Sequence, residues 1–117
     1  MTDMITLPGI SPDMIANNLV PFEPTHPGEM LREELECRGI TQTKLANGIG
    51  MKVSLLSELI NGKRDFTIEY AMLIEAALGI DADFWLNLQT AYNKGKVQQD
   101  RSFMERIANI RRIAAIL

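Results

Sequence analysis

The side chains of this 117-residue chain that could do chemistry concentrate between residues 41 and 64. Their types suit nucleic-acid recognition: lysine and arginine neutralise phosphates, lysine, serine and glutamate can hydrogen-bond to base edges, and valine can touch a thymine methyl. An amide side chain at a helix start can join the free backbone N–H groups in holding a phosphate. The candidate DNA-contacting residues are Gln42, Thr43, Lys44, Lys52, Val53, Ser54, Ser57, Glu58, Asn61, Lys63 and Arg64.

These candidates fall into three groups with different expected roles. Gln42 and Lys44 suit a phosphate at the start of one helix, positions 52 to 58 suit base edges, and positions 61 to 64 suit flanking phosphates. The base-facing group is poor in Arg, Gln and Asn, the residues that give bidentate readout, which predicts modest sequence discrimination. The alternatives for these groups are a surface turn, a helix that merely packs and a solvated basic loop.

The elements that must position these side chains are two short helices joined by a glycine turn. Thr41 is expected to cap a helix through about Gly48, with Leu45, Ala46 and Ile49 inward, and Gly50 supplies the turn. A second helix is expected from about Lys52 to Ile60, with Leu56, Leu59 and Ile60 inward and Asn61-Gly62 as its end. This layout is typical of a DNA-binding helix-turn-helix.

Three further helices are predicted around this pair. The first opens at His26-Pro27 and closes at Gly39, with Met30, Leu31 and Leu35 inward. The next is capped by Thr67 and runs from about Ile68 to Leu78; it is apolar nearly all round and is expected to be the most buried element. Asp81 and Asp83 favour the start of a fifth helix, which contains Phe84, Trp85, Leu86, Leu88 and Tyr92.

The two ends of the chain are predicted to extend this domain. Residues 1–24 form an N-terminal extension, with a possible strand over 5–7 and a brief helix from Ser11 to about Asn18. Residues 94–117 form an amphipathic helix announced by a capping box from Ser102 to Glu105. Its apolar stripe favours dimerisation, with intramolecular packing left open, and consists of Phe103, Ile107, Ile110, Ala114 and Leu117.

Composition limits the other function classes. The net charge is −3, but basic residues collect over 41–64 and 94–112, while 1–36 and 65–83 are acidic. One cysteine, Cys37, and one histidine, His26, give no disulfide framework and no metal-ligand set, so His26 is read as a helix-start residue and Cys37 as a packing residue. No cofactor, no catalytic constellation, no signal peptide and no membrane segment is predicted. We therefore expect a non-enzymatic, cytoplasmic protein.

Two stretches resemble a known family. Both are similar to HigA-type antitoxins of the phage-repressor-like (XRE) helix-turn-helix superfamily. The stretches are THPGEML at 25–31 and INGKRDFTIEYAMLIEAALGIDADFWLNLQTAYN at 60–93. The resemblance covers residues 25–93 and implies an all-α five-helix domain that is usually dimeric. It also implies a paired toxin that cleaves mRNA on ribosomes, and repression of the shared operon.

Carried over by position, the resemblance assigns roles to individual residues. Gln42 matches a phosphate-contacting glutamine, and Asn61, Lys63 and Arg64 match backbone contacts. Three residues depart from the family's pattern. Lys52 stands where a capping Ser or Thr is common in the family, and Val53 and Leu55 stand where polar residues are common. Base-facing positions of the family are matched by Lys52, Val53, Ser54 and Glu58.

The sequence therefore predicts an antitoxin with two partners besides a second copy of itself. One is operator DNA, and the other is a HigB-type toxin whose RNA-binding basic residues would be covered by Glu33, Glu34 and Glu36 or by the acidic N-terminal extension. The alternatives are a solitary XRE-type repressor without a toxin, and a toxin-binding scaffold whose DNA recognition is degenerate.

Overall fold

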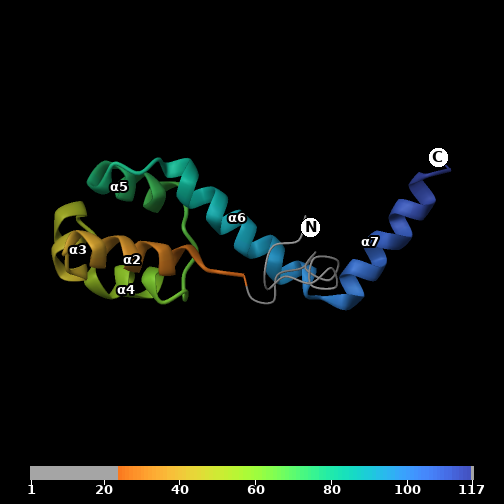
Figure 1. Cartoon of the computed structure of the whole chain (residues 1–117), viewed down its shortest axis with the longest axis horizontal. Helices are drawn as coiled ribbons and strands as arrows, with labels where there is room; N and C mark the ends of the chain where they lie inside the picture. The colour runs from red at the N-terminus through yellow and green to blue at the C-terminus, as the bar shows by residue number, and fades with distance from the viewer. Residues whose placement is uncertain (1–23, 117) are drawn as a thin grey trace, which may run out of the picture. The chain divides into compact units, whose positions relative to one another are not determined.

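The computed structural model describes residues 24–116 and shows an all-helical chain over that range. The predicted strand over 5–7 and helix over 11–18 lie outside the described residues. Five helices belong to the expected helix-turn-helix domain and one follows it, which confirms the predicted fold class (Figure 1). They are α2 (Pro27–Arg38), α3 (Gln42–Ile49), α4 (Val53–Ile60), α5 (Ile68–Leu78), α6 (Ala82–Gln98) and α7 (Arg101–Ala114).

The helices begin and end at capping residues that the sequence signals. Nδ1 of His26 accepts a hydrogen bond from the Gly28 N–H at 2.9 Å, so His26 is the N-cap of α2 as expected. Thr41 and Thr67 cap α3 and α5 in the same way through their hydroxyl oxygens. Gly50 has a φ of 72° and turns the chain from α3 towards α4, a conformation that a side chain would strain.

The hydrophobic core lies among α2, α4, α5 and the first half of α6. Leu31, Leu56, Leu59, Ile74 and Trp85 are fully buried there. Figure 1 shows α2 lying along α4, and α3 packs against both α4 and α5. Burial of these apolar side chains is the main stabilising contribution to the fold.

The start of α2 approaches the end of α4 so closely that a glycine is required. A Cβ atom placed on Gly28 would lie 2.2 Å from the Leu59 carbonyl oxygen and 2.6 Å from that of Ile60. Backbone atoms cannot move aside as a flexible side chain can, so residue 28 must lack a side chain. This contact fixes α2 against the helix that the sequence assigns to base reading.

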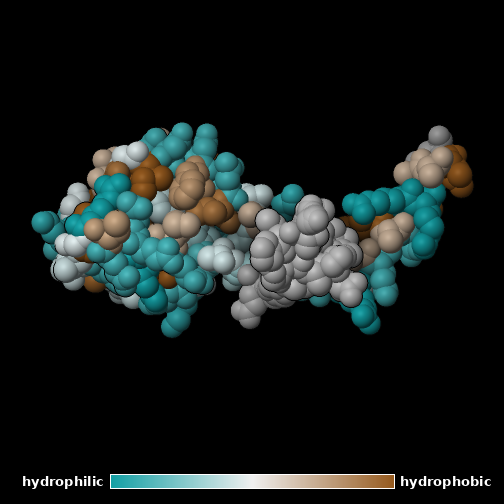
Figure 2. Space-filling model, in the orientation of Figure 1, coloured by the Kyte–Doolittle hydropathy of each residue, from teal (hydrophilic) through white to brown (hydrophobic). Residues whose placement is uncertain are grey.

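Two predictions about burial are wrong. The most buried element is not α5, because Ile68, Met72 and Leu73 are 65%, 56% and 38% exposed. Only one face of this helix, through Ala71, Ile74 and Leu78, meets the core. Met30, predicted inward on α2, is likewise 37% exposed. Figure 2 shows the resulting hydrophobic surface over α5 and the start of α6.

The described residues divide into two compact units. Residues Thr25–Lys94 form the first, and Pro24 with residues from Gly95 onward belong to the second. In the second unit, the predicted capping box at Ser102 is wrong. The N-cap of α7 is Asp100, two residues before Ser102, and its carboxylate accepts the Phe103 N–H at 3.1 Å. A carboxylate is a strong N-cap acceptor and also suits the positive end of the helix dipole.

Candidate nucleic-acid interface

Helices α3 and α4 form the predicted helix-turn-helix. Leu45 and Ala46 of α3 and Leu56 and Leu59 of α4 are buried, so the outer faces of both helices are left at the surface. The turn is closed by the Met51 N–H, which donates to the Ala46 carbonyl oxygen at 2.9 Å. This packing fixes the angle at which α4 is presented, which is the requirement for placing a helix in a major groove.

The start of α3 borders a hollow of about 290 Å³ lined in part by Thr41, Gln42 and Arg32. The Thr41 hydroxyl already accepts the Lys44 N–H at 3.1 Å. Gln42 is half-buried, whereas Thr43 and Lys44 are exposed. Arg32, on α2, was not among the sequence candidates, and it adds a positive charge where phosphate binding is expected at Gln42.

The N-terminal end of α4 is open to solvent. Lys52 is its N-cap residue and makes no side-chain capping hydrogen bond. Because this chain has a lysine where a capping Ser or Thr is common in the family, the first N–H groups of α4 have no side-chain cap. Lys52 and Ser54 are exposed, and Val53 is 38% exposed. The start of the predicted base-reading helix therefore presents one cation, one hydroxyl and one aliphatic side chain.

The C-terminal end of α4 is joined to α2 by polar side chains. Asn61 Nδ2 donates to Ser57 Oγ at 3.2 Å, and Asn61 Oδ1 accepts a hydrogen bond from an Arg32 terminal nitrogen. Ser57, a predicted base reader, is thus engaged with Asn61. Arg32 reaches both ends of the motif, because it also lines the hollow at Gln42. No local sequence signal predicts this, since Arg32 and Asn61 are 29 residues apart.

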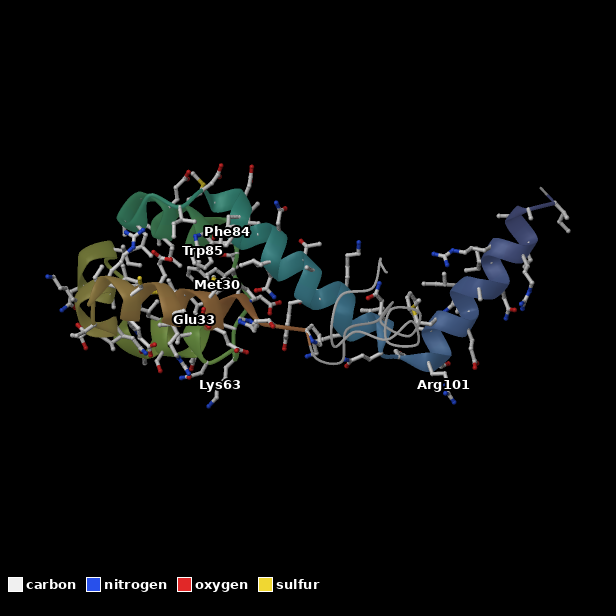
Figure 3. The ribbon with its side chains drawn as sticks, viewed as in Figure 1. Met30, Glu33, Lys63, Phe84, Trp85 and Arg101 are labelled. Carbon is white, nitrogen blue, oxygen red and sulfur yellow. The ribbon has the colours of Figure 1, made fainter. Side chains whose placement is uncertain are left out.

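Glu58 and Arg64 form an ion pair beside α4. Arg64 Nε donates to Glu58 Oε1 at 2.6 Å, and the two side chains are 48% and 44% exposed. The Glu58 hydrogen bond raises the pKa of the Arg64 guanidinium above its ordinary value, so Arg64 stays cationic. Lys63 is exposed and projects outward next to α4 (Figure 3).

A second candidate surface lies on α7, where no described residue is buried. Of the predicted stripe, Phe103 and Ile110 are 39% and 54% exposed, Ile107 is half-buried, and Ala114 is exposed. Leu117 lies outside the described residues. Ile113, which was not predicted, is 57% exposed and adjoins the stripe. Figure 2 shows hydrophobic surface along α7 among hydrophilic surface.

Other kinds of site find little support in residues 24–116. No group of three or more His, Cys, Asp or Glu side chains in this range is arranged to hold a metal ion. Cys37 is exposed, which makes its prediction as a minor packing residue wrong. No helix of this range combines the length and the hydrophobicity that crossing a membrane requires.

Comparison with known proteins gives the same assignment as the geometry. A helix-turn-helix family model matches residues 31–85. Antitoxin HigA-1 of Vibrio cholerae is 38% identical over 87 residues, which cover 70% of this chain and 82% of the relative. The chain belongs to the HigA-type helix-turn-helix family. All the candidate DNA-contacting residues fall inside residues 31–85, the range that the helix-turn-helix family model matches.

Solved structures of the HigA family share this fold. An addiction module antidote protein of the HigA family from Coxiella burnetii has a TM-score of 0.65 and 30% identity, over 71% of this chain and 91% of that one. Pseudomonas aeruginosa antitoxin HigA, solved with the higBA promoter, has a TM-score of 0.65 and 25% identity, over 70% and 90%. The second of these proteins is therefore seen together with promoter DNA.

Proposed function

We propose that this chain is the antitoxin of a type II toxin–antitoxin pair that represses its own operon. The observation that carries the proposal is the outer face of α3 and α4, where Gln42, Lys44, Lys52, Lys63 and Arg64 border the helix that would enter the major groove. The likeness to a HigA protein solved with promoter DNA supports the same assignment. Cations around a presented helix supply phosphate attraction, while the helix itself meets the bases.

The repressing species is proposed to be a dimer. One helix-turn-helix contacts a single half-site, so a palindromic operator requires two copies about one DNA turn apart. The exposed stripe from Phe103 to Ala114 on α7 is the proposed dimer surface, because no residue of that helix is buried in the part of the chain that the structure describes. A two-fold interface would place the same stripe on both sides.

The second activity is neutralisation of a HigB-type toxin that cleaves mRNA. We assign toxin contact to acidic residues, since an RNA-binding toxin needs basic ones. Within the predicted cluster, Glu33 is exposed, whereas Glu34 is paired with Arg38 at 2.7 Å. Glu36 borders the hollow near Gln42. Glu33 and Glu36 are both exposed and are thus the most available members of the cluster, and the acidic segment 1–24 is the other candidate.

Coexpression with a HigB-type toxin tests the toxin part. The full chain should restore growth, and loss of rescue in a Glu33→Gln, Glu34→Gln, Glu36→Gln variant or in a chain lacking residues 1–24 should identify the contact. Normal rescue by both variants would contradict the acidic-contact assignment. No rescue by the wild-type chain would favour a solitary repressor.

A toxin-binding scaffold with degenerate DNA recognition is the second candidate function. The observation that favours it is the apolar character of the reading face, where Val53 is 38% exposed and Leu55 is half-buried. An electrophoretic shift on the chain's own upstream DNA separates the two. A salt-sensitive shift that weakens in a Lys52→Ala, Arg64→Ala double variant supports the repressor, and no shift supports the scaffold.

A further inference from the structure

The chain that leaves α4 folds back onto the helix and brings Arg64 beside it. The Lys63 N–H donates to the Glu58 carbonyl oxygen at 2.8 Å, and the Gly62 N–H donates to that of Leu59 at 3.3 Å. With Gly62 at a φ of 77°, these bonds form a Schellman motif, which reverses the chain direction at a helix end. Arg64 follows immediately, and its side chain therefore returns along α4 to Glu58.

The Glu58–Arg64 pair orients the guanidinium more than it stabilises the fold. Both side chains are close to half exposed, and exposed pairs contribute only about 0–1 kcal/mol. The contact uses Nε, and the two terminal nitrogens of Arg64 make no hydrogen bond within the described residues. A guanidinium held by Nε keeps its terminal edge available, and that edge fits a two-acceptor partner such as the O6 and N7 of guanine.

Arg64 also lies next to the residues expected to face bases. One hollow of about 590 Å³ lies at the surface between α4 and α5, and it is bordered by Lys52, Ser54, Glu58, Arg64 and Tyr70. A lone carboxylate at position 58 would repel DNA phosphates, and the paired guanidinium offsets that repulsion. The surface judged poor in bidentate readers therefore gains one from the loop after α4.

We propose that Arg64 reads a guanine in the major groove, rather than only a phosphate, and that Glu58 is the positioning residue that aims it. This inference rests on the proposed operator binding. It changes the role of Glu58, which is then not itself a base-reading residue. It also makes Arg64 the main source of sequence discrimination on this face.

The test uses the full chain and two duplexes, its own upstream DNA and a scrambled duplex of equal composition. Arg64→Ala should weaken binding to the upstream DNA about ten- to a hundredfold and leave the scrambled duplex nearly unchanged. Arg64→Lys should restore little, because an ammonium cannot form the two parallel bonds. Lys63→Ala is the matched control: it should weaken both duplexes equally and lower the salt slope by about 0.9.

Glu58→Gln separates positioning from folding. It should reduce the preference for the upstream DNA, by weakening specific binding and strengthening binding to the scrambled duplex, while the melting temperature stays unchanged. Single guanines of the upstream DNA can be replaced by 7-deazaguanine, which lacks the N7 acceptor. At one position this replacement should weaken binding of the wild type but leave the affinity of Arg64→Ala unchanged.

Two results would overturn the inference while leaving operator binding intact. Equal loss on both duplexes in Arg64→Ala, with a lower salt slope, would make Arg64 a phosphate contact. Unchanged binding in Arg64→Ala would remove it from the interface altogether. A wild-type chain that does not prefer its upstream DNA would instead contradict the proposed function itself.

Discussion

Gln89 of α6 holds the loop that follows α4 through a buried hydrogen bond to Phe66. Its side-chain oxygen accepts the Phe66 N–H at 2.7 Å, and its Nε2 donates to Asp65 Oδ1 at 3.3 Å and Asn93 Oδ1 at 3.1 Å. Gln89 is only 4% exposed, so both ends of its amide are satisfied inside the protein. The loop that carries the cationic residues 63 and 64 is thereby fixed to the core.

Gln89→Leu is expected to destabilise the fold by about 1–3 kcal/mol, because the buried Phe66 N–H loses its acceptor. Urea unfolding followed by circular dichroism measures the change. Asn87→Leu on the same helix is the matched control, since Asn87 is exposed and its replacement should stay within about 0.5 kcal/mol. Equal effects of the two substitutions would show that the amide contact carries no special weight.

Gly28→Ala is expected to destabilise the fold by about 1–3 kcal/mol or more, because its Cβ would meet the Leu59 and Ile60 carbonyl oxygens. Gly48→Ala makes the same chemical change inside α3, where nothing lies within 4 Å of the new atom. It should raise stability by about 0.5–1 kcal/mol. Opposite shifts of the two melting temperatures would support the close contact between α2 and α4, and shifts of the same sign would contradict it.

The helices of this domain were predictable because their signals are local. Thr41, Thr67 and the glycines that end helices act on backbone groups within a few residues, so sequence spacing is enough to find them. Apolar content was a poorer guide to burial. An 11-residue helix such as α5 can turn one face to the core and leave Ile68 and Met72 outside. The composition of such a helix does not say which of its faces is buried.

The polar contacts of the candidate site were less predictable than the helices. Arg32 meets Asn61 only because α2 packs along α4, and that packing depends on the whole core. Glu58 and Arg64 are six residues apart, yet their pairing depends on the chain reversal at Gly62. Asn61, Glu58 and Arg64 were predicted at the interface from the sequence, whereas Arg32 was not. The contacts between these side chains depend on the folded arrangement of α2, α4 and the loop.

Ile110→Asp should dissociate the proposed dimer, because it puts a carboxylate in the centre of the α7 stripe. Sedimentation equilibrium at several concentrations measures the mass. Ala108→Asp adds the same charge on a different side of the helix and should leave the dimer intact. A dimer that survives Ile110→Asp would move the interface away from α7.

Thr41→Ala should destabilise α3 by about 1 kcal/mol, since the Lys44 N–H would lose its side-chain acceptor. Thr41→Ser retains the hydroxyl and should restore most of the loss. Thermal unfolding of the two variants measures the difference. Identical stability of the alanine and serine variants would mean that the cap does not contribute.

Operator binding by α3 and α4 can be measured by fluorescence anisotropy titrations at a series of salt concentrations. The full chain is titrated against its own upstream DNA and against a scrambled duplex of equal length. We expect tighter binding to the upstream DNA, with the logarithm of the association constant falling linearly with the logarithm of salt concentration. Equal affinity for the two duplexes, or binding that salt does not weaken, would contradict it.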